Sequence, residues 1–296
     1  ADTMATFDAS KLRIPFMKYR KICVGASILL MLLSLGMLFT KGLNLSVDFT
    51  GGLVLQVKFE QSVEVAQIRE SLSSIGQGQA IIQAYDNKDV LIRFQAQDED
   101  VRRSVLDKLK KDFGGLTILK IDKVGPVVGQ ELRAQAVIAL LLALAGILIY
   151  MAFRFKFRFG VAAVLSLVHD SILMLGVYSL TGKEVSVAFI AAILTVVGYS
   201  LNDTIVVLDR VRENWPALRS KGVLELVDNS INQTLSRTIN TSLTTLLPIV
   251  AMFIFGGEVI SNFAFAFLVG IVVGTYSSIY VASSVVAEWY LRSPKY

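Results

Sequence analysis

The sequence predicts a polytopic α-helical membrane protein with six transmembrane helices and one α+β domain inserted between the first two. Apolar residues make up 54% of the chain and charged residues 18%, whereas a soluble domain carries about 25% charged residues. The apolar residues fall in six long blocks, and charged residues return over residues 44–129. Helices of this length cross a hydrocarbon core of about 30 Å, so we expect six membrane crossings.

Each apolar block is expected to be a helix, because in lipid only helices and closed barrels satisfy their own backbone hydrogen bonds. The first block lacks a small-residue cleavage site and runs directly into a folded segment, so we do not expect it to be a removed signal peptide. The expected transmembrane helices are residues 22–41, 134–153, 159–180, 185–208, 238–255 and 263–284.

Positive charge predicts the orientation of these helices. Lys and Arg gather before the first helix, in alternate loops and in the tail, whereas the two short loops on the other side hold only Lys183. Loops rich in Lys and Arg stay in the cytoplasm, so both termini are expected there. The net charge of +5 is attributed to loops that face anionic lipids rather than to nucleic-acid binding. The expected cytoplasmic segments are residues 1–21, 209–237 and 285–296, and residues 44–129 are expected to be periplasmic.

The inserted domain has the pattern of a ferredoxin-like βαββαβ fold. Two amphipathic helices are expected over residues 63–75 and 98–113, because apolar residues recur there at helical spacing and glycines follow. The domain holds no His, no Cys and no Gly-rich phosphate loop, so neither catalysis nor a metal or other cofactor is expected. The expected strands are residues 53–59, 80–85, 90–94 and 116–124.

Glycine-rich segments join this domain to the first and second transmembrane helices. Glycine adopts backbone conformations closed to other residues, and proline fixes one torsion. Two interpretations stay open, namely tight turns at a domain boundary and a pair of hinges. The candidate hinge residues are Asp48, Gly51, Gly52, Gly125, Pro126 and Gly129.

Ionisable residues inside the expected helices are the main functional signal. A charge at mid-bilayer costs at least about 2.5–3.5 kcal/mol, so its presence calls for a reason. The interpretations are a proton relay or a buried network that fixes helix packing. We favour the relay for Asp203 and packing for His169, and leave Asp170 undecided. Arg237 is expected to look into the bundle with the threonines that follow it. The candidate relay residues are Asp203, Arg237, Asn202, His169 and Asp170.

Small residues in the expected helices favour close helix approach. The sixth helix carries a small-xxx-small motif, which as a lone motif indicates packing and nothing more. Residues 223–235 predict a separate amphipathic helix that lies on the membrane or against other helices. The candidate packing residues are Gly198, Gly270 and Gly274.

Several motifs together resemble the SecF branch of the SecD/SecF family of protein-export membrane subunits. They are the segment Val47-Asp48-Phe49-Thr50-Gly51-Gly52, the Val-Gly-Pro sequence at 124–126, His169-Asp170, the run Val197 to Val207 with Tyr-Ser-Leu-Asn-Asp at 199–203, Arg-Glu-Asn at 212–214, and Arg237 to Ser242. The resemblance runs from about residue 20 to residue 290.

This resemblance implies a multi-pass protein of the bacterial cytoplasmic (inner) membrane, built as one half of a resistance-nodulation-division (RND) type architecture. It implies pairing with SecD beside the SecYEG channel, often with YajC, and use of the proton motive force to help draw preprotein clients out after SecA has pushed them into the channel. By motif, Asp203 falls on the intramembrane carboxylate of the family and Arg237 on the basic residue associated with proton passage.

Other functions stay open at this point. One is an RND-type half-transporter of small molecules or lipids, and another is a scaffold that only stabilises the export complex. An enzyme is not expected, because no nucleophile–base pair, metal cluster or phosphate loop is visible. The sequence leaves open whether the chain is a separate subunit or half of a SecDF fusion.

Overall fold

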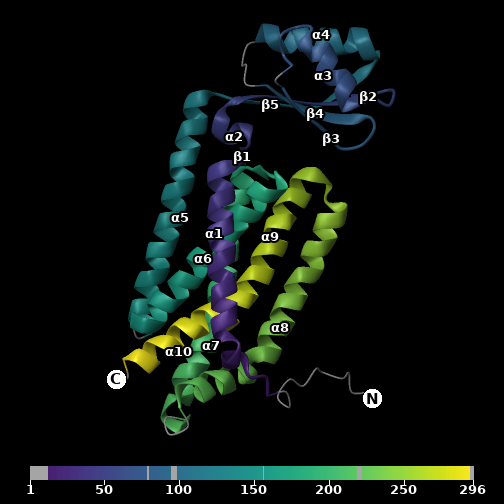
Figure 1. The fold of residues 1–296 in the computed structure, drawn as a ribbon. Helices are drawn as coiled ribbons and strands as arrows, with labels where there is room; N and C mark the ends of the chain where they lie inside the picture. The colour runs from purple at the N-terminus through teal and green to yellow at the C-terminus, as the bar shows by residue number, and fades with distance from the viewer. Residues whose placement is uncertain (1–12, 79, 95–98, 156, 219–221, 294–296) are drawn as a thin grey trace, which may run out of the picture. The chain divides into compact units, whose positions relative to one another are not determined.

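The computed structural model describes residues 13–78, 80–94, 99–155, 157–218 and 222–293. The chain divides into two compact units, which are described separately (Figure 1). The outer unit consists of Leu45–Ile138 and Glu184–Val187, and the remaining residues form the membrane unit.

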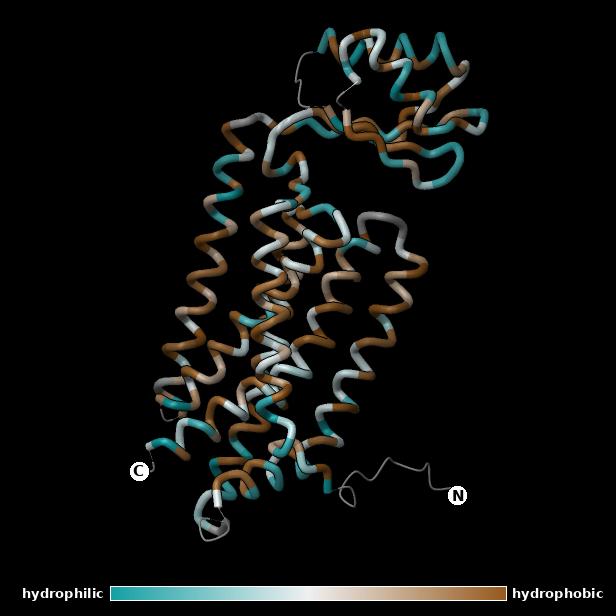
Figure 2. The backbone as a smooth tube through the Cα atoms, in the orientation of Figure 1, coloured by the Kyte–Doolittle hydropathy of each residue, from teal (hydrophilic) through white to brown (hydrophobic). Residues whose placement is uncertain are grey.

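Among the described residues, six helical segments are long and apolar enough to cross a membrane, and the predicted fold class is confirmed. Hydrophobic residues run along most of their length (Figure 2). The last crossing is a chain of three elements in which a π-helical turn, η4, separates two α-helices. The helices are α1 (Arg20–Thr40), α5 (Pro126–Arg154), α6 (Phe157–Thr181), α7 (Val187–Leu218), α8 (Val223–Phe255), α9 (Gly257–Ser277), η4 (Ser278–Ala282) and α10 (Ser283–Arg292).

Helix α6 is the centre of the membrane unit. In its most apolar window 61% of the residues are buried inside the chain, against 6% for α1. It contacts both α1 and α9. The exposed apolar surface of α1 suits contact with lipid or with another membrane protein, whereas α6 is enclosed by protein.

Helix α8 differs from its predicted boundaries. Residues 223–235 and 238–255 form one continuous helix rather than an amphipathic helix followed by a separate span. Its first turns bury Leu226, Val227 and Ile231 in a core with α6, α7 and α10. The amphipathic pattern therefore arises because this part of the helix packs on other helices rather than lying on lipid.

A short 3-10 helix, η2 (Phe16–Lys18), precedes the first crossing. The backbone N–H of Met17 donates to Oδ1 of Asp228 at 2.7 Å, and that of Ile14 donates to Oδ1 of Asn232 at 2.9 Å. The segment before α1 is therefore bound to the start of α8. Of the expected cytoplasmic segment 1–21, residues 1–12 lie outside the described residues.

The inserted domain has the predicted βαββαβ order. All strands of its four-stranded sheet are antiparallel, in the order β3-β4-β2-β5, and both helices lie on one face of the sheet (Figure 1). A second, two-stranded sheet joins β1 and β6. The elements are β1 (Asn44–Leu45), α2 (Val47–Thr50), β2 (Gly52–Phe59), α3 (Val65–Ser73), β3 (Ile81–Ala84), β4 (Asp89–Phe94), α4 (Glu99–Phe113), β5 (Leu116–Val124) and β6 (Glu184–Val185).

The central strand β2 builds the core of this domain. Its alternate residues Leu53, Leu55, Val57 and Phe59 are at most 3% exposed and meet apolar residues of α3 and α4. Successive side chains of a strand point to opposite faces, so one face of β2 receives both helices. The side chain of Gln67 accepts a hydrogen bond from the Glu64 backbone N–H at 3.2 Å and helps to cap the start of α3.

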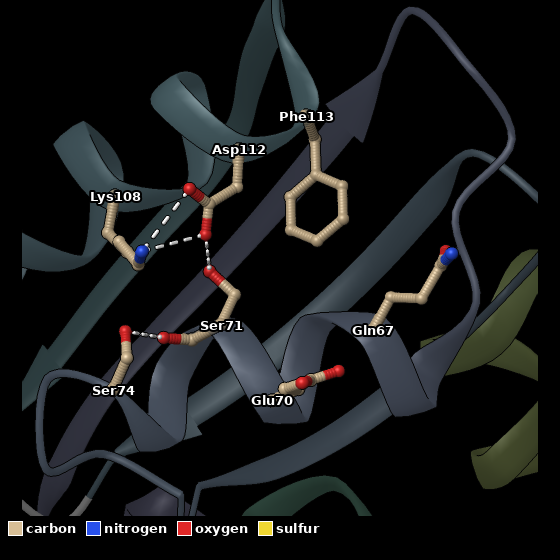
Figure 3. Close-up of a pocket in the computed structure, with 7 residues that line it drawn as sticks. All are labelled: Gln67, Glu70, Ser71, Ser74, Lys108, Asp112 and Phe113. Atoms are coloured by element: carbon tan, nitrogen blue, oxygen red, sulfur yellow. Dashed lines mark hydrogen bonds and ion pairs between the residues drawn. The ribbon is translucent and has the colours of Figure 1, made fainter.

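A polar hollow lies between the outward surfaces of α3 and α4 (Figure 3). Ser71 donates to Oδ2 of Asp112 at 2.6 Å, and Nζ of Lys108 lies 3.0 Å from the same oxygen. The Ser71 hydrogen bond, followed by Lys108, lowers the pKa of Asp112 below its ordinary value. Lys108 is thus paired within its own helix at the surface, and the hollow includes none of the sequence-predicted site residues.

Candidate functional site: buried carboxylates in the membrane unit

The first carboxylate, Asp170 of α6, sits in a closed network of hydrogen bonds. Its Oδ2 atom accepts from Ser200 of α7 at 2.6 Å and from Ser277 of α9 at 2.9 Å. Nδ1 of His169 lies 3.0 Å from the other carboxyl oxygen, Oδ1. Ser166 of α6 in turn donates to Ser277 at 3.0 Å. Asp170 is 1% exposed, and it joins three helices at one point.

The second carboxylate, Asp203 of α7, has a different environment. It is 2% exposed, and its Oδ2 atom is buried without a hydrogen-bond partner among the described residues. Its neighbour Thr204 shares a hydrogen bond with Ser278 of η4 at 2.8 Å. The carboxylate of Asp203 therefore lacks hydrogen bonds of the kind that Asp170 receives from Ser200 and Ser277.

Arg237 of α8 is the charged group that acts on Asp203 through space. The guanidinium nitrogens of Arg237 lie more than 4.0 Å from the carboxyl oxygens of Asp203, too far for an ion pair. Arg237 is exposed on the surface of the chain. Asn202, Asn240 and Thr244 are exposed as well. The expectation that the face of Arg237 looks into the bundle is therefore wrong for this chain taken alone, because α8 turns Thr238 and Ser242 inward instead.

Two glycines of α9 allow this arrangement. A Cβ atom on Gly274 would lie 2.9 Å from Oγ and Cβ of Ser200, and one on Gly270 would lie 2.5 Å from Val196. Their absence lets α7 and α9 approach closely enough for Ser200 and Ser277 to share Asp170. Gly198 differs, since nothing lies within 4 Å of a Cβ built there, and close packing does not require a glycine at that position.

The glycine-rich segments beside the domain are folded into the outer unit. Gly51 has φ +69° as the residue that ends α2, and Gly52 has φ +140° and pairs with Val124 in the sheet. A Cβ on Gly52 would collide with the carbonyl oxygen of Phe94. The first predicted hinge is thus built into a helix end and a strand.

The second predicted hinge continues directly into a membrane-spanning helix. Pro126 is the first residue of α5. A Cβ on Gly129 would lie 2.9 Å from the carbonyl oxygen of Phe49, whereas Gly125 has open space around it. The two flanking segments therefore pack against each other through Gly129.

Several site residues escaped the sequence analysis. Ser166, Ser200 and Ser277 resemble small packing residues in sequence, and only their convergence shows that they serve Asp170. Arg93 of β4 was also missed. It follows the apolar residues Val90, Leu91 and Ile92, is 6% exposed and forms an ion pair with Glu184. A charged residue among Val, Leu, Ile and Phe was the available signal.

The fold and site define a polytopic membrane protein whose helices enclose ionisable side chains and carry an inserted α+β domain. The chain belongs to the SecD/SecF family. It matches the family described as "Protein export membrane protein SecD/SecF, C-terminal" over residues 104–292, and the SecD/SecF GG motif over residues 36–63.

Individual relatives agree with this family. The chain is 45% identical to protein translocase subunit SecF of Desulfurispirillum indicum, over 93% of this chain and 91% of the relative. It is 44% identical to SecF of Pseudomonas aeruginosa with the same coverage. It is 47% identical to protein translocase subunit SecDF of Thermus thermophilus, over 94% of this chain and 38% of that longer protein.

Solved structures of SecDF share the fold. A crystal structure of SecDF from Thermus, described as a translocon-associated membrane protein, matches with a TM-score of 0.89 at 46% identity, covering 96% of this chain and 39% of that one. SecDF in a super-membrane-facing form matches with a TM-score of 0.75 at the same identity, covering 96% and 40%.

Proposed function

We propose that this chain is an accessory subunit of the bacterial Sec protein translocase and that, paired with a SecD-type half, it uses the proton motive force to promote late preprotein translocation. The observation that carries the proposal is Asp203, a carboxylate that is 2% exposed with an unpartnered oxygen inside an apolar helix. Burying a carboxylate inside the membrane is costly, so carboxylates at this depth are rare, and those that occur commonly mark ion paths. The names of the SecF and SecDF relatives supply the context of protein translocation.

A proton needs carriers on either side of Asp203. Several buried polar atoms on α6, α7 and α8 have no hydrogen-bond partner among the described residues, and they include His169 Nε2, Tyr199 Oη, Asp203 Oδ2 and Thr238 Oγ1. Buried polar atoms are normally satisfied, and internal water molecules bridge them where protein groups do not. Water among these atoms would connect Asp203 to proton donors and acceptors.

Arg237 has a distinct role in the proposal. A guanidinium does not release its proton in proteins, so Arg237 cannot relay protons and acts instead by its charge. When it approaches, it favours ionised Asp203, and when it withdraws, it favours the protonated form. Its exposed position on α8 leaves room for such movement.

The exposed polar face supports a partner. Asn202, Arg237, Asn240 and Thr244 lie on the surface of this chain within otherwise apolar helices. Polar side chains at membrane depth face protein or water rather than lipid, so this face suits a second helical bundle. This chain covers only 38–39% of the SecDF relatives, so each of them contains a further portion longer than the matched one. We assign the exposed polar face to contact with such a SecD-type half.

The available energy is sufficient for a conformational step. One elementary charge crossing 100 mV releases about 2.3 kcal/mol. Fully coupled, this shifts a two-state equilibrium by roughly fiftyfold. We assign the domain to the periplasm and both termini to the cytoplasm, because basic residues gather on the side of the termini.

Proton flux into proteoliposomes that hold the chain with its SecD-type partner tests the proposal. Asp203→Asn should reduce the flux to that of protein-free liposomes and should reduce proton-dependent export in cells depleted of the native subunit. Glu288→Gln is the matched control, since Glu288 forms an exposed 3.1 Å pair with Arg292 and its replacement should leave both unchanged. Unchanged flux and export in Asp203→Asn would reduce the chain to a scaffold of the translocase.

A further inference from the structure

The segment between α6 and α7 belongs structurally to the outer unit. Residues Glu184–Val187 group with the inserted domain, although they lie far from it in sequence. The backbone N–H of Ser46 donates to the carbonyl of Val185 at 2.9 Å, which continues the pairing of β1 with β6. The domain therefore holds the chain at the point where α7 begins.

A buried ion pair strengthens this attachment. Nη2 of Arg93, in β4, donates to Oε2 of Glu184 in β6. Arg93 pairs with Val54 of β2 and Ile81 of β3 in the sheet, and its side chain is 6% exposed. Breaking a buried ion pair leaves an uncompensated charge and is strongly destabilising, so the two partners hold each other in place.

A third contact is made to the helix itself. Oδ2 of Asp48 accepts from the backbone N–H of Val187, the first residue of α7, at 3.2 Å. The first N–H groups of a helix have no intrahelical partner, and a carboxylate there also complements the helix dipole. Asp48 sits in the first turn of α2, whose N-cap Ser46 fixes it by accepting from the Asp48 N–H at 3.1 Å.

We infer that these contacts form a clasp, defined as Arg93–Glu184 together with Asp48 on Val187, through which the inserted domain moves together with α7. Helix α7 carries Ser200, Asp203 and Thr204, so a shift of α7 on protonation would be passed directly to the domain. This inference rests on the proposed function. The inserted domain is covalently joined to α1 and α5, and the clasp adds a noncovalent link to α7. Arg93 and Glu184 are positioning residues in this scheme, since neither touches the proton.

The charges around Glu184 suit a persistent contact. Burial raises its pKa above the ordinary value, and the Asp48 carboxylate raises it further, whereas Arg93 and Lys120 of β5 lower it. The carboxylate thus depends on Arg93 to stay ionised among these neighbours. Asp48 and Glu184 repel each other through space, and Arg93 offsets that repulsion.

Uncoupling of proton passage from export tests the clasp. Arg93→Met and Glu184→Gln are each placed in the full chain with its SecD-type partner, and proton flux and preprotein export are measured in parallel. Arg102→Met is the matched control, because Arg102 forms an exposed i,i+3 pair with Glu99 in the same domain. We expect export to fall roughly fivefold or more, the lower range of ordinary coupling energies, while Asp203-dependent flux persists.

Protease resistance of the domain separates uncoupling from unfolding. Glu184→Gln keeps the size of the side chain and an acceptor oxygen, so the domain should stay folded in this variant. It therefore tests the clasp even if Arg93→Met loosens the domain. Unchanged export in a folded Glu184→Gln protein, or flux and export that fall together, would overturn the clasp. Absence of Asp203-dependent flux in the unmodified complex would instead refute the proposed function.

Discussion

The hydroxyl of Ser200 donates to Oδ2 of Asp170 at 2.6 Å, and one helical turn further along α7 the Oδ2 atom of Asp203 has no partner among the described residues. Two buried carboxylates of similar exposure thus have opposite hydrogen-bonding states. A saturated carboxylate stabilises helix packing, whereas an unsaturated one retains the capacity to change its protonation state. Within the proposed function, this difference favours a packing role for Asp170 and a proton-carrying role for Asp203.

The contrast predicts opposite effects on stability. Asp170→Leu removes the acceptor shared by Ser200 and Ser277 and should lower the free energy of unfolding by about 1–3 kcal/mol, since buried donors are left unpaired. Asp203→Leu, the matched change, should leave stability unchanged or raise it, because it replaces an incompletely paired carboxylate. Thermal unfolding of the purified chain in mild detergent measures both, and equal losses in the two variants would contradict the assignment.

Close approach of α7 and α9 predicts a second pair of variants. Gly274→Val should destabilise the bundle by about 1–3 kcal/mol, because its side chain would collide with Ser200 and displace it from Asp170. Gly198→Ala is the control on the same pair of helices, since open space surrounds that position. Detergent unfolding of both proteins decides the matter, and a tolerated Gly274→Val would show that the helices adjust.

Backbone conformation predicts a third pair. Gly52→Ala should destabilise the inserted domain by about 1–3 kcal/mol, because φ is +140° and the new Cβ would strike the Phe94 carbonyl. Gly125→Ala has room for its Cβ and should leave both folding and export unaffected. Limited proteolysis of the domain compares the two, and loss of export in a folded Gly125→Ala protein would instead favour a hinge at that position.

Glu184 predicts a dependence on pH. Its folded pKa lies above the ordinary value of 4.5, so its contribution to stability is fully present below that value and is lost as pH rises through the folded pKa. Arg93 lowers the pKa of Glu184, and Arg93→Met should therefore raise it further. The stability deficit of Arg93→Met relative to the unmodified protein should be largest near neutral pH and should shrink as pH falls toward 4.5.

Hydrogen exchange of the β4 and β6 amides across this pH range measures that deficit. Arg102→Met again serves as the control, because its surface pair with Glu99 should give a small deficit. A deficit in Arg93→Met that stays constant, or that grows in acid, would show that the ion pair does not govern the protonation of Glu184.

Much of the fold follows from local sequence pattern. The apolar blocks and the βαββαβ order were predictable because span length and side-chain periodicity are local properties. The single helix 223–255 was not, because the polar residues around Arg237 imitate a loop where the helix in fact continues. A polar face on a long helix and a connection between two helices give the same composition.

The site was predictable only in part. Asp203, Asp170 and His169 stood out because charge in an apolar helix is costly. Their partners did not, since Ser200 and Ser277 come from helices far apart in sequence and acquire a role only by meeting at Asp170. Arg93 and Glu184 likewise become meaningful only when β4 and β6 are brought together.

The π-helical turn Ser278–Ala282 fixes the orientation of α10, Ser283–Arg292. The hydroxyl of Ser283 donates to the Ser278 carbonyl, five residues earlier, at 3.0 Å. An inserted residue in such a turn rotates everything after it by about 100° relative to an unbroken α-helix. This rotation sets the direction from which Tyr290 packs against Trp215, with ring centroids 4.2 Å apart and ring planes tilted by 43°. Removing one residue from the turn would rotate α10 about its axis, and the side chain of Tyr290 would then point away from Trp215.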